Sequence, residues 1–135
     1  MERPRIFLAD DHAEFLALAV RLVESEFEVV KTFGDGQAMV NEVAAYDPDL
    51  LVLDISMPGL NGIEAALQLK EAGRKTKIVF LTVHQDSDYL RSALATGALG
   101  YVVKDRLALD LIAALREVLA GRRFVSGTLA QEQNT

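Results

Sequence analysis

Five short apolar runs alternate along the chain with five segments of helical periodicity. The runs cover residues 6–9, 27–33, 50–54, 78–83 and 100–103. Between them, apolar residues recur every three or four positions, which predicts amphipathic helices. Strands that alternate with helices at this spacing pair in parallel through right-handed crossovers. The pattern therefore predicts an α/β fold: a doubly wound, five-stranded parallel sheet with helices on both faces.

Capping and breaking residues predict where the helices begin and end. The expected N-caps are Asp11, Asp35, Asn61 and Asp86 or Ser87, and the expected stops are Pro48, Gly73, Gly97 and Gly121. Helical spacing also predicts the inward-facing residues, among them Leu18 in the first helix, Val43 in the second and Leu67 in the third. After Gly121 the periodicity is lost. We therefore expect residues 1–121 to form the domain and 122–135 to be a tail or the start of a linker to an output domain.

Composition limits the class of protein but does not indicate a particular function. The chain has 135 residues, half of them hydrophobic, a net charge of −6 and no cysteine; its pI is near 4.9. One domain of ordinary size is expected, and the acidic balance argues against binding nucleic acid directly. We find no signal peptide and no run of about 18 apolar residues that could span a membrane. The expected location is cytoplasmic, with no membrane partner.

Polar residues collect where the predicted strands end. Asp10 and Asp11 follow the first strand, Asp54 ends the third, Thr82 lies in the fourth and Lys104 follows the fifth. The carboxyl ends of parallel strands meet at one edge of the sheet, so these side chains should converge there. Oxygen ligands without cysteine favour Mg²⁺, while a lysine and a hydroxyl suit a phosphoryl group. The set predicts metal-assisted phosphoryl transfer, with a carboxylate as possible nucleophile; Asp54 alone could equally be a turn cap.

These residues resemble the receiver domain of bacterial response regulators over the span from Arg5 to Gly121. The matching motifs are the pair Asp10-Asp11, LDISMPGLNG around Asp54, FLTV around Thr82 and GYVVKD around Lys104. The strings LTVHQD, ALATGALGYVVKD and LAGRRFVSG are most similar to receivers of the NarL/FixJ group, which usually precede a LuxR-type DNA-binding domain. The resemblance implies a flavodoxin-like (βα)5 fold with strand order 2-1-3-4-5.

The resemblance also implies a role for each residue of the edge. Asp54 would be the phosphoacceptor and would take its phosphoryl group from a phosphohistidine of a histidine kinase. Asp10, Asp11, Asp54 and the backbone carbonyl of Ser56 would bind Mg²⁺. Lys104 would pair with the phosphoryl oxygens. The domain would be regulatory rather than an enzyme, would possibly dimerise when phosphorylated, and would reach DNA only through an output domain.

Two residues would form the switch, one position departs from the pattern of many receivers, and two positions vary within the family. Thr82 would donate a hydrogen bond to the phosphoryl group, after which Tyr101 would turn inward. Asp105 stands where many receivers have a cis proline, so the Lys104–Asp105 peptide bond is either trans or strained. Ser56 and His84 occupy two positions that tune the dephosphorylation rate in this family.

Three alternatives stay open at this point. The chain could be a stand-alone receiver that acts through protein contacts. It could be a Mg²⁺-dependent phosphohydrolase, although Ser56 stands where such enzymes usually carry a second aspartate. It could bind a flavin-like cofactor, although the loop from Asp10 to His12 is hostile to an anion. His12 is interpreted as a helix-start residue rather than a metal ligand, and His84 as a loop residue rather than a general base.

Overall fold

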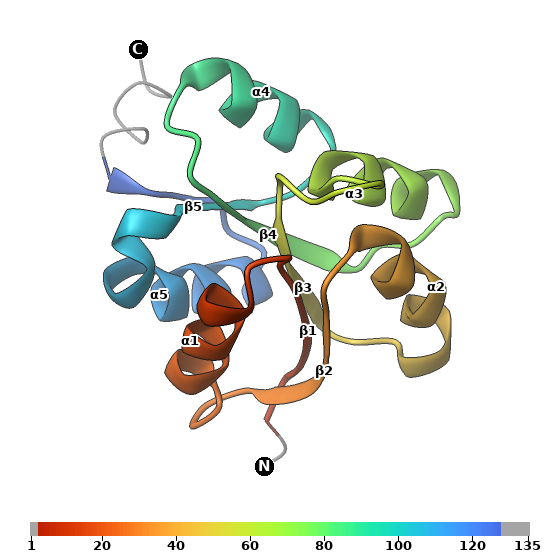
Figure 1. Ribbon diagram of the computed structural model, residues 1–135, viewed down its shortest axis with the longest axis horizontal. Helices are drawn as coiled ribbons and strands as arrows, with labels where there is room; N and C mark the ends of the chain where they lie inside the picture. Colours follow the sequence, from red (N-terminus) through yellow and green to blue (C-terminus); the bar gives the residue numbers. More distant parts are fainter. Residues whose placement is uncertain (1–2, 128–135) are drawn as a thin grey trace.

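The computed structural model describes residues 3–127, which form one six-stranded parallel sheet flanked by helices (Figure 1). The strand order is β2-β1-β3-β4-β5-β6. The strands are β1 (Arg5–Ala9), β2 (Glu28–Phe33), β3 (Leu50–Asp54), β4 (Lys77–Thr82), β5 (Gly100–Val103) and β6 (Phe124–Val125). The helices are α1 (Ala13–Val23), α2 (Gly36–Tyr46), α3 (Gly62–Glu71), α4 (Ser87–Ala95), the 3₁₀ turn η1 (Lys104–Arg106) and α5 (Leu107–Leu119).

The structure confirms the predicted α/β architecture and the parallel order of the first five strands. The predicted number of strands, five, was wrong. Phe124 and Val125 form β6, which pairs in parallel with Gly100 and Tyr101 of β5. Two residues are too few to show an alternation of apolar and polar positions. Only their pairing with the edge of β5 shows that they form a strand. The rest of the predicted tail, residues 128–135, lies outside the described residues.

Helices cover both faces of the sheet, and each face has its own core. Figure 1 shows α1 and α5 on one side and α2, α3 and α4 on the other. Alternate residues of each strand point to opposite faces, so Leu51 and Leu53 join the core under α2 to α4. Leu50 and Val52 join the core under α1 and α5. β3 is buried on both faces, which explains why its sequence is almost entirely apolar.

Most predicted helix caps are confirmed, and one is wrong. Side chains of Asp35, Asn61 and Asp86 accept hydrogen bonds from backbone amides at the starts of α2, α3 and α4. The N-cap of α1 is His12 instead of Asp11, and its side chain makes no capping bond. The Asp11 carboxylate lies 3.2 Å from the His12 ring nitrogen Nδ1. Its carboxylate also has an oxygen within 4.8 Å of carboxylate oxygens of Asp10 and Asp54, so this acid lies with them at the edge of the sheet.

Two residues predicted to face inward are instead well exposed. Leu18 is 44% exposed and Leu67 is 42% exposed. On α3 the buried residues are Gly62, Ala65, Ala66 and Leu69, and Leu67, next to Ala66, lies outside this face. Small alanines face the sheet because the helix lies close to it. Helical spacing alone does not distinguish the positions predicted to face inward from the positions that are buried.

Two further observations concern the backbone and membrane spanning. Residues 3–127 contain no cis peptide bond, so the Lys104–Asp105 bond is trans. None of the helices among these residues is long and apolar enough to cross a membrane.

Candidate phosphoryl-transfer site

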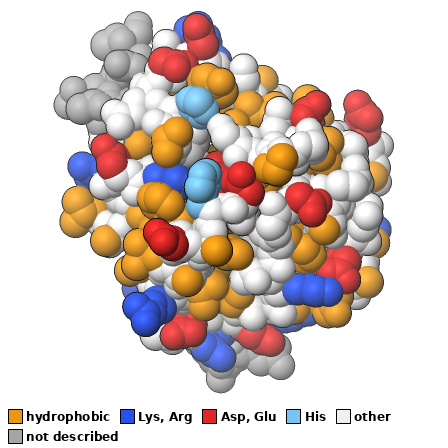
Figure 2. Space-filling model, viewed as in Figure 1, with side chains coloured by type: hydrophobic (Ala, Val, Ile, Leu, Met, Phe, Trp, Pro, Cys, Tyr) orange, Lys and Arg blue, Asp and Glu red, His pale blue; other side chains and the backbone are white. Residues whose placement is uncertain are grey.

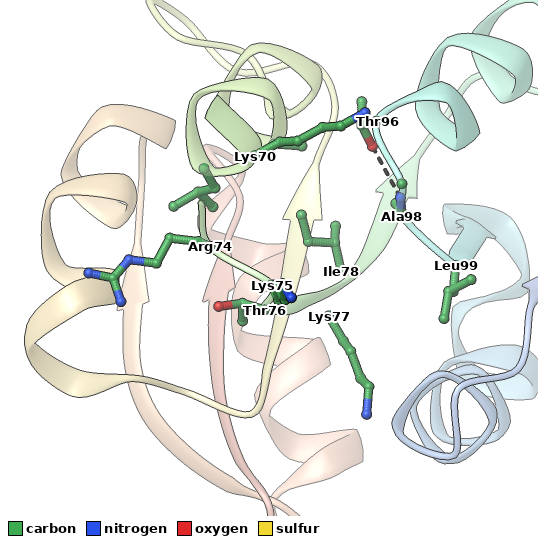
Figure 3. A pocket seen from close by; sticks show the side chains of 12 residues that line it. Lys70, Arg74, Lys75, Thr76, Lys77, Ile78, Thr96, Ala98 and Leu99 are labelled. Atoms are coloured by element: carbon green, nitrogen blue, oxygen red, sulfur yellow. Dashed lines mark hydrogen bonds between the residues drawn. The ribbon is translucent and has the colours of Figure 1, made fainter. Parts of the chain in front are cut away.

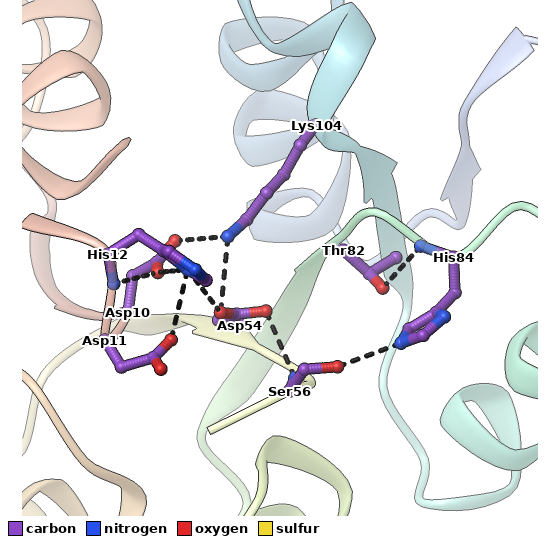
Figure 4. Close-up of polar contacts among 8 residues, drawn as sticks. All are labelled: Asp10, Asp11, His12, Asp54, Ser56, Thr82, His84 and Lys104. Carbon is purple, nitrogen blue, oxygen red and sulfur yellow. Dashed lines mark hydrogen bonds and ion pairs between the residues drawn. The ribbon is translucent and has the colours of Figure 1, made fainter. Parts of the chain in front are cut away.

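The parallel register brings the predicted acids and the lysine together at the carboxyl edge of the sheet. Ala9, the last residue of β1, pairs with Leu53, so Asp10 and Asp54 leave neighbouring strands at the same level. Figure 2 looks onto this edge and shows acidic, basic and histidine side chains gathered near its centre. The close-up in Figure 4 shows Lys104 reaching over from the end of β5 toward both acids. The sequence-based grouping of these three residues is therefore present in the structure.

Lys104 joins two buried carboxylates. Its Nζ atom lies 2.7 Å from Oδ2 of Asp10 and 3.2 Å from Oδ2 of Asp54. All three side chains are at most 3% exposed. Two negative charges and one positive charge thus share a site from which water is largely excluded, where charge–charge effects are stronger than at the surface. Nζ also lies 4.6 Å from the centre of the Phe15 ring, a cation–π contact that the sequence did not predict.

Backbone amides orient one oxygen of each carboxylate. The amide of His12 donates to Oδ1 of Asp10 at 2.8 Å, and the amide of Ser56 donates to Oδ1 of Asp54 at 3.1 Å. Oδ2 of Asp10 is different: it is buried, and apart from its ion pair with Lys104 it accepts no hydrogen bond from the described residues. The Lys104 ammonium, 2.7 Å away, compensates the charge of this oxygen but does not occupy all of its lone pairs. A lone pair remains that can face a cation.

The environment of Asp54 disfavours its charge. Burial is the main cause and, together with the charge of Asp10, raises the pKa of Asp54 to about 6. Lys104 and the Ser56 amide act in the opposite direction but do not cancel the rise. A divalent cation beside Asp54 would favour the ionised form, which is the form that can act as a nucleophile.

Four side chains are placed to hold such a cation. Ligand atoms of Asp10, Asp11, His12 and Asp54 all lie within 4.8 Å of one another. Three of the four are carboxylates, the ligands that Mg²⁺ prefers, and Lys104 is the one described partner of the buried Asp10 Oδ2. The residues present therefore fit Mg²⁺. His12 Nδ1 lies 3.2–3.9 Å from carboxylate oxygens of all three acids (Figure 4), so His12 is a helix-start residue beside the site, as predicted.

Thr82 and Tyr101 meet at the loop that follows β4. Thr82 is fully buried, and its Oγ1 accepts a hydrogen bond from the His84 amide at 3.0 Å. The Tyr101 hydroxyl donates to the His84 carbonyl oxygen at 2.9 Å, and its ring is fully buried. Burial raises the pKa of Tyr101 to about 12, against an opposing effect of the Thr82 hydroxyl. The aromatic residue of the predicted switch thus occupies its inward position in this structure.

Ser56 and His84, the two variable positions, contact each other. Ser56 Oγ lies 2.9 Å from His84 Nε2 in a hydrogen bond (Figure 4). The His84 ring stacks on Tyr89 of α4, with centroids 3.7 Å apart and planes 5° from parallel. His84 is a loop residue as predicted, and it connects the Ser56 side of the site to the first turn of α4. No spacing rule relates residues this far apart in sequence, so this contact was missed.

Gly62 is a second residue of the site that the sequence analysis missed. A Cβ atom at this position would overlap the carbonyl oxygen of Asp54 and come within 3.0 Å of the Ile55 Cα atom. The Gly62 amide donates to the Ile55 carbonyl oxygen at 2.9 Å. The start of α3 therefore lies directly against the backbone of the phosphoacceptor candidate, and only glycine allows this approach.

A cavity at the opposite edge of the sheet has different chemistry. It has a volume of about 330 Å³ and lies between the end of α3 and the loop before β5 (Figure 3). Its charged lining is basic, namely Lys70, Arg74, Lys75 and Lys77. Because this cavity has no carboxylate in its lining, it cannot combine a nucleophilic acid with a metal site. The carboxyl edge remains the candidate site.

Comparison with known proteins agrees with this geometry. The response regulator receiver domain family matches residues 6–116. The transcriptional regulatory protein DegU of Brevibacillus brevis is 37% identical over 123 residues, which cover 90% of this chain and 52% of DegU. This chain thus spans about half the length of that curated relative.

Solved structures give the same fold. A LuxR-family two-component response regulator from Aurantimonas sp. SI85-9A1 superposes with a TM-score of 0.91 and 34% identity, covering 97% of this chain and 95% of that one. The receiver domain of RcsB from Salmonella enterica serovar Typhimurium, solved in the presence of the phosphomimetic BeF3−, gives 0.83 and 26% identity and covers 96% and 98%. The family is regulatory rather than one of classical enzymes, which sets aside the phosphohydrolase and flavin-binding alternatives. The chain belongs to the response regulator receiver domain family of two-component systems.

Proposed function

We propose that Asp54 accepts a phosphoryl group from the phosphohistidine of a histidine kinase. One observation carries this proposal: Asp54 is a buried carboxylate at a strand end with a buried lysine nitrogen 3.2 Å from its Oδ2. In the transfer, an oxygen of Asp54 attacks phosphorus while the bond from phosphorus to the histidine nitrogen breaks. The kinase imidazole leaves as a neutral ring after taking up a proton, and the phosphoryl group stays on Asp54 as an acyl phosphate.

Lys104 and the neighbouring acids divide the remaining work. Lys104 balances the negative charge that the phosphoryl oxygens bring into this poorly hydrated edge. Asp10, Asp11, Asp54 and the carbonyl of Ser56 would hold Mg²⁺, which would supply positive charge to the phosphoryl oxygens. The Ser56 amide keeps one oxygen of Asp54 engaged, so the other faces Lys104 and the incoming group.

The response to phosphorylation is proposed to run through Thr82 and Tyr101. The Thr82 hydroxyl uses its oxygen to accept from His84, which leaves its proton free for a phosphoryl oxygen. That second bond would hold the loop after β4 in the arrangement that also receives the Tyr101 hydroxyl. Since Tyr101 already points inward, phosphorylation would raise the population of this arrangement rather than create it.

The output is proposed to lie in a longer protein. The receiver, whose sheet extends past the expected boundary at Gly121 to β6, would be followed by a segment that leads to a DNA-binding domain, as the transcriptional relatives suggest. Phosphorylation would then change dimerisation of the receiver or its contact with that domain. The proposed setting is the cytoplasm, with the histidine kinase as the partner.

A small phosphodonor tests the central assignment. The chain is incubated with acetyl phosphate and Mg²⁺, and its intact mass is compared with those of Asp54→Ala and Asp49→Ala. Asp49 is an exposed acid whose carboxylate accepts a hydrogen bond from the Arg5 amide and lies away from the carboxyl edge, so it is a matched control. The wild type and Asp49→Ala should gain one phosphoryl group, and Asp54→Ala should gain none. Equal labelling of all three proteins would refute Asp54 as the acceptor.

A further inference from the structure

Ser126 lies where the chain leaves the domain, and it is bonded to the strand that carries Lys104. Its side chain is buried, with 1% of the residue exposed. Ser126 Oγ accepts a hydrogen bond from the Val103 amide at 3.0 Å, and the Ser126 amide donates to the Tyr101 carbonyl oxygen at 2.9 Å. Val103 immediately precedes Lys104. Ser126 therefore hydrogen-bonds to the backbone at two points, Tyr101 and Val103. The first is the switch aromatic, and the second directly precedes the site lysine.

The Val103 amide depends on this serine. It lies at the end of β5, where the two residues of β6 no longer supply a backbone acceptor, and it is buried with the strand. Without this acceptor the buried amide would have no hydrogen-bond partner to offset its loss of water, which is unfavourable. The hydroxyl of Ser126 thus continues the ladder by one bond and holds the end of β5 at the level from which Lys104 reaches Asp54.

The strand β6 has little stability of its own. It is two residues long, and the Phe124 amide donates to Leu99 at 2.9 Å. Phe124 packs against the core under α1 and α5, whereas Val125 packs against the other core. Such a short edge segment opens locally at a low free-energy cost. Its position therefore responds to small shifts of β5.

We propose that Ser126 is a positioning residue for Lys104 and that β6 transmits the state of Asp54 to the chain that follows. This inference rests on the proposed function, because it takes Lys104 as the partner of the phosphoryl group. A phosphoryl group that draws Lys104 into one position also fixes Val103, and through it Ser126 and β6. Linkage is reciprocal: if Asp54 occupancy stabilises β6, then weakening β6 weakens phosphoryl binding by the same factor.

The test uses beryllofluoride as a stable stand-in for the phosphoryl group, in the full 135-residue chain. Hydrogen exchange of the Val103, Phe124 and Ser126 amides is measured by NMR with Mg²⁺ alone and with Mg²⁺ plus beryllofluoride. Beryllofluoride should slow exchange at all three amides. Unchanged rates at these amides, in a protein that binds beryllofluoride, would overturn the proposal.

Substitutions supply the reciprocal measurement. Ser126→Ala should weaken beryllofluoride binding by about fivefold or more, while affinity for Mg²⁺ alone should change less than about twofold, because the acids come from β1 and β3. Ser126→Thr keeps the hydroxyl and should restore binding. Ser25→Ala, at an exposed turn on the far edge, is the matched control and should bind like wild type. Equal losses for both ligands would indicate general loosening and would overturn the positioning role.

Different outcomes would refute the assignment of Asp54 and the role of Ser126. If the wild type does not bind beryllofluoride, the assignment of Asp54 is wrong and this inference falls with it. If the wild type binds and Asp54→Ala does not, but Ser126→Ala binds normally, only the role of Ser126 is refuted. Should Ser126→Ala fail to fold, the exchange rates of the wild type and the affinity of Ser126→Thr decide.

Discussion

At the scale of the residue, Asp54 combines a buried position with the role of phosphoacceptor proposed for it. An acid chosen only for stability would not stand between two cores beside a second buried carboxylate. Lys104 compensates part of the charge, and the pKa of Asp54 still rises to about 6. The site therefore holds unfavourable electrostatic free energy that a bound cation or a change of protonation can release.

The sign of this effect predicts a pH-dependent stability difference between wild type and Asp54→Asn, measured without divalent cations. Below the ordinary carboxyl pKa, near 3.8, Asp54 is protonated in both folded and unfolded chains. Between that value and about 6 the folded chain keeps a proton that the unfolded chain has lost, so wild-type stability falls as pH rises. Asn cannot ionise. In urea unfolding at pH 7.5, Asp54→Asn should be more stable by on the order of 2 kcal/mol.

The same comparison at pH 4.5 provides the control. There the folded Asp54 is largely neutral, so the advantage of Asp54→Asn should shrink to a small fraction of its value at pH 7.5. An advantage that is constant across this range would show that the carboxyl of Asp54 is not destabilised by its charge.

Tyr101 permits a second residue-scale prediction. Its phenol is buried, which raises the pKa of Tyr101 to about 12. The neutral phenol stabilises the fold fully below its ordinary pKa near 10, and this contribution is lost as pH rises through about 12. A phenolate absorbance titration of wild type minus Tyr101→Phe should show one transition at about 12. A transition near 10 would place Tyr101 in contact with solvent.

At the scale of the element, α3 is positioned by a glycine and a capping box. Asn61 and Glu64 exchange side chain–backbone hydrogen bonds at the start of α3. The next residue after the cap, Gly62, rests against the backbone of Asp54. The segment LDISMPGLNG is therefore a compact connection in which the end of β3 and the start of α3 are in close contact.

This contact predicts that Gly62→Ala destabilises the domain. A methyl group there overlaps the Asp54 carbonyl, so α3 or the end of β3 must shift, at a cost of about 1–3 kcal/mol. Gly34→Ala is the matched control because a Cβ at that position meets nothing within 4 Å. Urea unfolding should show a loss for Gly62→Ala and no loss for Gly34→Ala. Equal stability of the two variants would contradict the close approach.

At the scale of the whole molecule, Mg²⁺ bound at the carboxyl edge should raise the stability of the folded chain. The acids that would hold the ion come from separate segments and meet only in the folded chain, so Mg²⁺ binds the folded state selectively. At a concentration one hundred times its Kd, Mg²⁺ should raise the free energy of unfolding by about 2.7 kcal/mol. Thermal unfolding with Mg²⁺ and with EDTA measures the difference.

Asp11 separates this specific effect from general screening by salt. Its side chain is 30% exposed, so Asp11→Ala should fold normally and lose most of the Mg²⁺ stabilisation. Asp88→Ala removes an exposed acid that pairs with Arg91 on α4 and should keep it. If both variants respond to Mg²⁺ like wild type, the ion does not bind at the carboxyl edge.

The sequence by itself determined the fold class and most of the site. Strand periodicity is local, because two-residue alternation and short apolar runs follow from which face of a strand is buried. Strand ends are also visible in the sequence, and parallel pairing brings all of them to one edge. For this reason Asp10, Asp54 and Lys104 could be grouped before any distance was known.

Only the tertiary structure decided what depends on neighbours distant in sequence. The pairing of Phe124 and Val125 with β5, the contact of Ser56 with His84, and the bond from Val103 to Ser126 join segments between 23 and 28 residues apart. Two-residue strands and single hydrogen bonds carry too little free energy to impose a sequence pattern of their own. They form because the sheet has already placed their partners within reach.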